Sequence, residues 1–444
     1  MFGRLVRTLI SGARESTTRA PLVLQAVLGL VLAFGPLTAL AQSPRWWKGN
    51  LHTHSLWSDG DDYPEMIVAW YKENGYDFLG LSDHNVLQTG EKWVTVTTNR
   101  NRIAAFEKYV KRFGESWVEV KEEGGQKKVR LKTLEEFRKL SEEPGKFLLI
   151  QCEEISANYQ QSPIHINASN LREVIPPQGG NSIRAVLQNN IDAVLEQRRR
   201  TGQPMVPHIN HPNFIWVLTA EDIMLVRGER FLEIYNGHPV TKDPGDAEHA
   251  STERIWDVVL TRRLGELGLE AIWGTAVDDA HSYHNFRVGS PNPGRGWTMV
   301  WAAALTPEAI IAAMEAGDFY STSGVRLKEV RREAKRLAIE IEDEPGVTFT
   351  TRFIGTRKGY DLRSEPVRDK DGKEIRATRR YSAEVGAVLA EVKGLNPSYA
   401  LKGDEIYVRA TITSSKAKDN PAFQGDREQA WVQPLVVEAN TVRR

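Results

Sequence analysis

The chain has 444 residues, of which 41% are hydrophobic, so it is long enough for two domains and apolar enough for a substantial core. Its 58 basic residues balance its 58 acidic residues, and the net charge is zero. That balance argues against a dedicated nucleic-acid-binding protein, which would carry a basic excess. It does not exclude a small phosphorylated substrate such as a nucleotide, because bound metal ions would supply positive charge.

The first 41 residues have the pattern of an export signal peptide. Basic residues precede an apolar run over 21–40, and Ala39 and Ala41 form a small-x-small cleavage site. An uncleaved membrane anchor is the alternative, because the run is long enough to span a bilayer. Gly29, Gly35 and Pro36 interrupt the run and favour cleavage. We therefore expect a periplasmic or secreted protein with no stable membrane span after cleavage.

The segment 44–326 alternates short apolar strands with helical patterns. Strands are expected near residue 51 and at 78–81, 147–150, 204–207, 231–234, 270–274 and 298–302. Helices are expected at 64–74, 183–199, 251–264 and 307–316. A capping box formed by Thr133 and Glu136 predicts the start of a further helix. Segments 117–120 and 128–131 flank Gly124-Gly125 and predict a hairpin. The alternation implies a parallel sheet, and the number of repeats favours a closed α/β barrel.

From residue 327 the pattern changes to strands joined by charged, turn-rich loops. Strands are expected at 337–341, 347–353, 388–392, 405–412 and 431–435. The segment 327–444 is therefore predicted to be a small all-β, sandwich-like domain. Cys152 is the only cysteine, so no internal disulfide can form, and its strand-like surroundings predict a buried thiol.

Histidines and carboxylates follow the predicted strands of the first domain. In His52-Thr53-His54 the two imidazoles are two residues apart on a strand and therefore share a face. The carboxyl ends of parallel strands in a barrel meet at one rim, so polar groups that follow several strands are expected to converge there. The further groups are Ser58-Asp59-Gly60, Ser82-Asp83-His84, Glu153-Glu154, His208 and His211, and Asp278-Asp279-Ala280-His281, with His165 expected on another segment of the same rim.

Mixed imidazole and carboxylate ligands favour zinc, manganese or iron over calcium or magnesium. The candidates are too many for one ion and fit two or three. Adjacent divalent ions lower the pKa of a bridging water, so that hydroxide forms near neutral pH, and they polarise a phosphoryl or carbonyl oxygen.

In this order the motifs resemble the polymerase and histidinol phosphatase (PHP) domain. The resemblance implies a distorted seven-stranded, TIM-like (β/α)7 barrel and a hydrolytic site with two or three metal ions, in a family whose characterised members are mostly phosphoesterases. It favours Glu154 over Glu153 and His211 over His208, and it gives Asp83 the task of orienting a ligand histidine. The implied ligands are His52, His54, Asp59, His84, Glu154, His165, His211, Asp279 and His281.

Residues 317–324 and the closing β-rich segment are similar to an exported branch of this family that includes carbaryl-type carbamate hydrolases. Phosphoester hydrolysis is therefore the first expectation, and hydrolysis of a carbamate or carboxylic ester on the same metals is the alternative. A non-catalytic exported binding protein is the second alternative. In each enzymatic case the expected partner is a small-molecule ester.

Several further side chains are candidates for the reaction itself. Asp59 and His84 are expected to act in catalysis as well as in metal binding, and His284 is a candidate general acid. His238, Arg287 and Arg295 are candidates for substrate binding. For His284 and the two arginines, an ordinary structural or solvated role is the competing interpretation.

Overall fold

The structure is a computed structural model that describes residues 43–96 and 100–437. The predicted signal peptide lies outside the described residues. The segment Gln42–Arg444 forms one compact unit. Within the described ranges, every helix is too short or too polar to span a bilayer.

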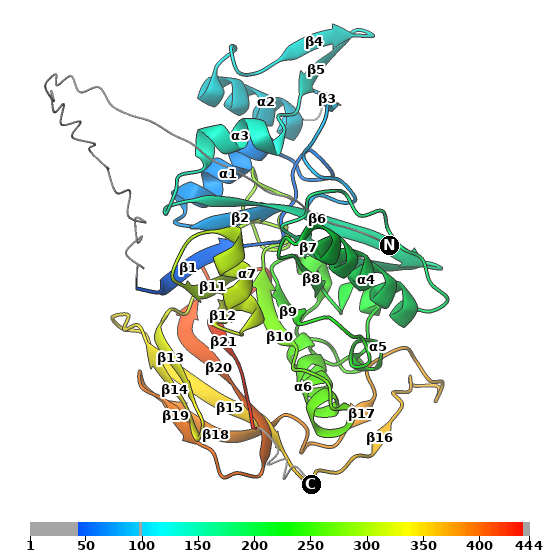
Figure 1. Cartoon of the computed structure of the whole chain (residues 1–444), viewed down its shortest axis with the longest axis vertical. Helices are drawn as coiled ribbons and strands as arrows, with labels where there is room; N and C mark the ends of the chain where they lie inside the picture. The colour runs from blue at the N-terminus through cyan, green and yellow to red at the C-terminus, as the bar shows by residue number, and fades with distance from the viewer. Residues whose placement is uncertain (1–42, 97–99, 438–444) are drawn as a thin grey trace, which may run out of the picture. The chain divides into compact units, whose positions relative to one another are not determined.

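The central feature is a 13-stranded mixed sheet in the order β10-β9-β8-β7-β6-β2-β1-β11-β12-β21-β20-β15-β18 (Figure 1). Its first half comprises the strands that precede the candidate ligands. They are β1 (Arg45–Asn50), β2 (Phe78–Leu81), β6 (Leu148–Tyr159), β7 (Ser162–Ser169), β8 (Val206–Ile209), β9 (Phe231–Asn236) and β10 (Trp273–Val277). Most neighbours in this half are parallel, but β7 is antiparallel to both β6 and β8.

The two ends of this half meet beyond the strand ends. Thr53, which follows β1, forms a parallel bridge with Ala280, which follows β10. The amide of His54 donates to the carbonyl of Ala280 at 3.0 Å, and the amide of Asp279 donates to the carbonyl of His52 at 2.9 Å. The fold is thus mixed α/β with a large sheet. The regular seven-stranded barrel is not confirmed, because this junction is a single bridge rather than a strand ladder.

Helices pack on the first half of the sheet (Figure 1). α1 (Pro64–Glu73) contacts β2, α4 (Ile183–Thr201) contacts β6, β7 and β8, α6 (Thr252–Arg262) contacts β9, and α7 (Pro307–Glu315) contacts β11. Their predicted bounds are confirmed within a few residues. Local caps explain this agreement: Ser182 accepts a hydrogen bond from Ala185 at the start of α4, and α3 (Leu134–Ser141) has the predicted capping box.

An insertion after β2 comprises β3 (Trp93–Thr95), α2 (Arg100–Phe113), β4 (Val120–Glu123) and β5 (Gln126–Arg130). The sequence did not indicate the helix α2. The turn at Gly124-Gly125 joins β4 and β5 as predicted. Two short helical elements lie elsewhere, α5 (Ala220–Ile223) between β8 and β9 and the π-helical turn η3 (Arg263–Leu267) directly after α6.

The C-terminal segment is β-rich, as predicted. After β12 (Phe319–Thr322), which precedes the predicted boundary, it contains β13 (Leu327–Glu333), β14 (Arg336–Ile341), β15 (Phe349–Arg357), β16 (Ser364–Glu365), β17 (Arg380–Tyr381), β18 (Ala387–Lys393), β19 (Ser398–Ala400), β20 (Glu405–Ala417) and β21 (Arg427–Val436). The sheet β13-β14-β19 shares a hydrophobic core with β15, β20 and β21. Strand β21 also pairs with β12, which pairs with β11 (Trp297–Ala302), so the large sheet is continuous across residue 327. The proposed domain boundary stays a prediction.

Two strand predictions were wrong in ways that affect the site. β6 runs from Leu148 to Tyr159 instead of ending at residue 150, because it pairs with β2 on one side and β7 on the other. Glu153 and Glu154 therefore lie within a strand rather than after one. β8 begins two residues later than predicted, and His208 is part of it.

Candidate metal centre

The nine predicted ligands come together from seven segments of the chain. His52 and His54 follow β1, His84 follows β2, His211 follows β8, and Asp279 and His281 follow β10, whereas Glu154 and His165 lie within β6 and β7 and Asp59 lies in a loop. All nine belong to groups whose nitrogen and oxygen atoms lie within 4.8 Å of one another. These groups are His54–Asp59–His84–His281, His52–His54–Glu154, His52–His211–Asp279, His84–Glu154–His165 and, with two additional residues, His52–His208–Glu233.

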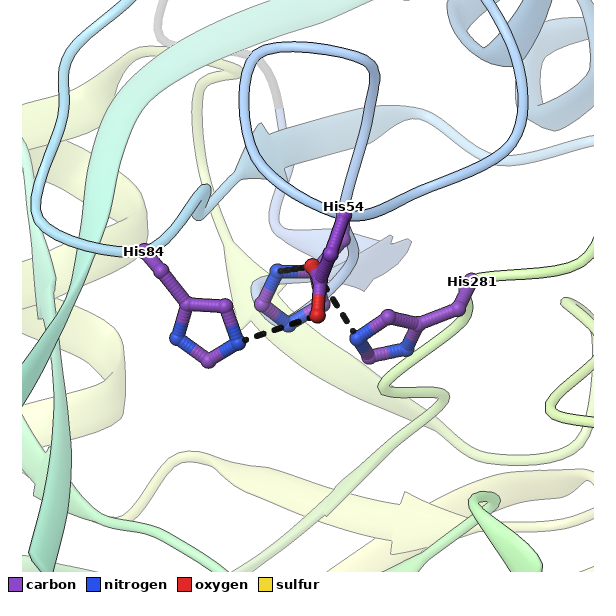
Figure 2. Close-up of side chains that lie close together, drawn as sticks. His54, His84 and His281 are labelled. Carbon is purple, nitrogen blue, oxygen red and sulfur yellow. Dashed lines mark ion pairs between the residues drawn. The ribbon is translucent and has the colours of Figure 1, made fainter.

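Three imidazoles surround the carboxylate of Asp59. Its oxygens lie 3.6 Å from Nδ1 of His54, 3.6 Å from Nε2 of His84 and 3.4 Å from Nε2 of His281. Figure 2 shows the rings of His54, His84 and His281 close together, with dashed lines at the ion pairs. The side chain of Asp59 is 56% exposed, so this part of the cluster is open to solvent.

Glu154 and Asp279 occupy the buried part of the cluster. One oxygen of Glu154 lies 3.0 Å from Nδ1 of His165, and the other lies 3.3 Å from Nε2 of His54. Asp279 Oδ1 lies 3.2 Å from Nε2 of His52 and 3.1 Å from Nε2 of His54. Glu154 and His54 each belong to more than one of these groups, so they link the exposed and the buried parts of the cluster.

Several buried polar atoms in the cluster have no hydrogen-bond partner. They are His52 Nε2, His54 Nε2, Glu154 Oε2 and His165 Nδ1. Buried polar atoms are rarely left in this state, since each loses its hydration without compensation. Imidazole nitrogens and carboxylate oxygens converging in this way have the donor chemistry of a divalent transition-metal site.

The electrostatics of the cluster agree with this interpretation. Burial alone would raise the pKa of Glu154 and Asp279, but the surrounding histidines hold the pKa of both carboxyls well below the usual range. Burial would lower the pKa of His52, yet Asp279, Glu233 and Glu154 outweigh it and raise that pKa. Among the described ion pairs, every partner of Glu154, Asp279 and Glu233 is a histidine. Divalent cations would replace the protons on these imidazoles.

Neighbouring polar groups orient the ligands. His52 Nδ1 lies 2.6 Å from Glu233, His84 Nδ1 lies 2.6 Å from Oγ of Ser156, and His281 Nδ1 donates to the carbonyl of Asp279 at 2.9 Å. For His52 and His281 the contact occupies Nδ1 and leaves Nε2 for the cluster, which is how metal-binding histidines are usually fixed. Nδ1 of His84 also lies 3.0 Å from Glu154.

Two polar residues at the cluster were not assigned from the sequence. Glu233 is almost fully buried, and the apolar pattern identified it only as part of strand 231–234. For the second histidine, the family resemblance favours His211 over His208. His208 Nε2 lies 3.3 Å from Glu233 Oε1. A carboxylate inside an otherwise apolar strand was the signal that would have identified Glu233, because an ionised group is rarely buried without partners.

The substrate-binding arginines do not reach the cluster. Arg295 is buried, and its guanidinium donates to carbonyls of Gly237, Arg287, Asn420 and Pro421. It therefore holds loops together, and the substrate-binding prediction was wrong for this residue. Arg287 is exposed and contacts Ser290 within its own loop.

His284 and Asp83 also differ from expectation. His284 lies against Asp62, with Nε2 3.5 Å from Oδ2, and contacts Lys108 through Nδ1, so the structure does not bring it to the metal-binding residues. Asp83 touches no ligand histidine. It accepts hydrogen bonds from Ser55, Ser58 and Gln88, and it thereby fixes the loop that carries Asp59.

A cavity of about 310 Å³ opens onto the cluster. Seven predicted ligands line it, together with His238, Phe214, Val240 and Thr241. These ligands are Asp59, His84, Glu154, His165, His211, Asp279 and His281. His238 accepts a hydrogen bond from the amide of Val240 at Nδ1, so its proton lies on Nε2. Its role in substrate binding stays a prediction.

Neither the models of known protein families nor the curated proteins gave a match to this sequence. Among solved structures, the chain is similar to a two-domain protein from Bacteroides vulgatus containing a predicted PHP-like metal-dependent phosphoesterase, with 13% identity, a TM-score of 0.36 and coverage of 88% of this chain and 95% of that chain. It is also similar to a protein from Bifidobacterium adolescentis described as a candidate metal-dependent phosphoesterase, with 13% identity, a TM-score of 0.27 and coverage of 56% and 91%. Similarity at this level does not define chemistry, which depends on the side chains present.

Proposed function

We propose that the protein is a metal-dependent hydrolase of small esters with a PHP-type centre of two or three divalent ions. The observation that carries the proposal is the convergence of His52, His54, Glu154 and His165, whose buried nitrogen and oxygen atoms lack hydrogen-bond partners. Manganese, zinc and iron suit such donors. Export remains part of the proposal through residues 1–41.

Divalent ions, when bound, supply a water of lowered pKa and a Lewis acid for the ester oxygen. The residues of the chain hold and orient these ions. His54 and Glu154 are shared between groups, and Asp59 completes the open side of the cluster. His238 presents an Nε2–H donor at the cavity, where it can hold a substrate oxygen.

A phosphoester is the first proposed substrate class, and a carbamate or carboxylic ester is the second. The second class is favoured by one feature of the cavity: the cationic side chains that line it are limited to histidines among the described residues. A highly charged phosphate would therefore depend on the metal ions and on His238 for its binding.

The test combines metal analysis with turnover. Elemental analysis of the purified protein is expected to show at least two ions per chain after incubation with manganese or zinc. The metal-loaded protein is then assayed with 4-nitrophenyl phosphate, bis(4-nitrophenyl) phosphate and 4-nitrophenyl acetate. Asp279→Asn is expected to lower the hydrolysis rate at least about 100-fold. Mutation of a residue that only orients a metal ligand can already lower activity by up to about 100-fold, and Asp279 is proposed as a ligand itself.

Arg287→Ala serves as the control, because the exposed Arg287 contacts only its own loop. Its activity should equal that of the original protein. A protein that stays metal-free under supplementation, or an Asp279→Asn variant with full activity, would show the proposal to be wrong. Cleavage of the acetate alone would select the carboxylic ester class.

A further inference from the structure

One wall of the metal cavity is apolar and comes from two short helical turns. They are η1 (Phe214–Trp216) and η2 (Pro239–Thr241), which pack against each other. Phe214 and Val240 line the cavity beside the metal-binding histidines. Val240 is 46% exposed, and Ile215, next to Phe214, is 54% exposed. We refer to Phe214 and Val240 as the η1–η2 wall; Ile215 belongs to the same turn as Phe214 but does not line the cavity.

Charged groups near this wall are engaged elsewhere. The ammonium of Lys242 lies over the ring of Trp216 at 4.8 Å, and Arg295 is bound to backbone carbonyls. Neither of these residues lines the cavity. A substrate group that extends from the metal ions along the wall therefore meets aromatic and aliphatic carbon rather than positive charge.

The backbone of the wall is held in an unfavourable conformation. Ile215 has φ 44° and Trp216 has φ 62°, in the left-handed region that β-branched residues rarely adopt. Side chains hold the loop in place: the Asn213 amide donates to the carbonyls of Lys242 and Ala250, and Trp216 stacks on His249 with ring centroids 4.0 Å apart. This conformation leaves Ile215 exposed, so the strain is not compensated by burial of its side chain. Such uncompensated strain is typical of binding sites.

We infer that the η1–η2 wall is a subsite for an apolar alkyl or aryl group of the substrate. The substrate class is then a small ester whose reacting phosphoryl or acyl centre carries an apolar substituent, rather than a sugar phosphate or a nucleotide. The inference rests on the proposed function for the position of the reacting centre. The cavity volume of about 310 Å³ is at the lower end for small-molecule sites and accommodates one such group beside the ester.

The test measures binding rather than turnover. Phenylphosphonate and methylphosphonate are not hydrolysed, and they differ only in the apolar group. Isothermal titration calorimetry with the manganese-loaded protein is expected to show phenylphosphonate binding about tenfold more tightly, as burial of one ring face predicts. Val240→Thr keeps the β-branched shape and should reduce this ratio several-fold. Phe214 is not varied, because it packs against His211 and His165.

Val388→Thr is the matched control, since Val388 lies on β18 and is 55% exposed. It should keep the full ratio. Equal affinities for the two phosphonates, no binding of either, or a Val240→Thr variant that behaves like the control would each overturn the subsite. A protein that prefers phenylphosphonate but hydrolyses no ester would instead contradict the proposed function and leave the subsite standing.

Discussion

Glu233 connects the metal-binding histidines to the strand behind them. Its carboxylate contacts Nδ1 of His52 at 2.6 Å and Nε2 of His208 at 3.3 Å, and it accepts hydrogen bonds from the amide of His211 at 2.7 Å and from Asn236 at 3.0 Å. The histidines hold the pKa of this buried carboxyl well below its usual range. Glu233 therefore stays ionised and sets the orientation of His52.

Glu233→Gln is expected to weaken metal binding about 10- to 100-fold, because the amide cannot fix the same imidazole tautomer. Competition with a chromogenic chelator measures the affinity. Glu229→Gln is the matched control: Glu229 is equally buried, but it accepts hydrogen bonds only from the amides of Arg230 and Phe231. Equal metal affinities in the two variants would contradict this role for Glu233.

For single residues, the sequence predicted which candidate ligands lie close together but not all of the side chains that contact them. His52, His84 and Asp279 could be placed because each follows a recognisable strand, and strand ends converge. Arg295 was misjudged because its partners are carbonyls from distant loops, which no local pattern encodes. Glu233 was missed because its strand was identified from the apolar residues around it.

Strand β6 separates two adjacent carboxyls. Glu154 faces the metal-binding residues, whereas Glu153 points to the other side of the strand, where Oε2 accepts a hydrogen bond from the amide of Ile175 at 2.9 Å and Oε1 has no partner. Burial raises the pKa of Glu153 to about 7. The folded protein therefore holds a proton here that the unfolded chain releases at lower pH.

This shift makes the stability of the protein depend on pH. Because the folded-state pKa is raised, the favourable contribution of the protonated group is present below about pH 4.5 and is lost as the pH rises through 7. Glu153→Gln should thus raise the free energy of unfolding by about 2–3 kcal/mol at pH 8 and much less at pH 5. Urea unfolding at both pH values measures the difference.

The same substitution at Glu119 is the control. Glu119 pairs with Arg130 and Lys132, whose hydrogen bonds lower its pKa to about 2, so Glu119→Gln should not stabilise the protein at pH 8. A Glu153→Gln variant whose gain is the same at pH 5 and pH 8 would rule out titration of Glu153 as the cause.

Elements defined by local signals were predicted better than elements defined by pairing. α4 and α7 begin at side-chain caps, and their predicted bounds are nearly correct. β6 was predicted too short because its second half is stabilised by β7, a partner that the apolar pattern did not show. α2 was missed because its segment is rich in arginine and lysine, although the helix is amphipathic.

The two halves of the described chain are joined by buried polar contacts as well as by the sheet. Arg409 of β20 forms a bidentate ion pair with Asp257 of α6, with distances of 2.7 and 2.8 Å, and it is 1% exposed. Gln433 of β21 both donates to and accepts from the backbone of Gly274 in β10. The C-terminal segment is therefore part of the structure that supports the metal-binding residues.

Arg409→Ala is expected to lower the free energy of unfolding by about 3–5 kcal/mol, because it leaves the Asp257 carboxylate buried without its charged partner. Chemical denaturation followed by tryptophan fluorescence measures the loss. Arg352→Ala is the matched control, since Arg352 pairs with Glu391 at the surface and should cost less than about 1 kcal/mol. Similar losses in the two variants would show that the buried ion pair contributes no more to the free energy of unfolding than the exposed one.

The change of character at residue 327 was visible in the sequence, but the continuity of the sheet across it was not. Pairing of β12 with β21 joins residues 319–322 to residues 427–436, and such long-range pairing leaves no local signature. For the same reason the alternation of strands and helices indicated an α/β fold without specifying how its sheet closes.

The bridge between Thr53 and Ala280 joins positions that are 227 residues apart. Contacts of such high sequence separation form late in folding, because a long loop must close before they gain anything. The candidate ligand set is therefore incomplete in a growing chain until Asp279 and His281 have emerged. Metal loading, as proposed above, would follow synthesis of the chain at least as far as residue 281.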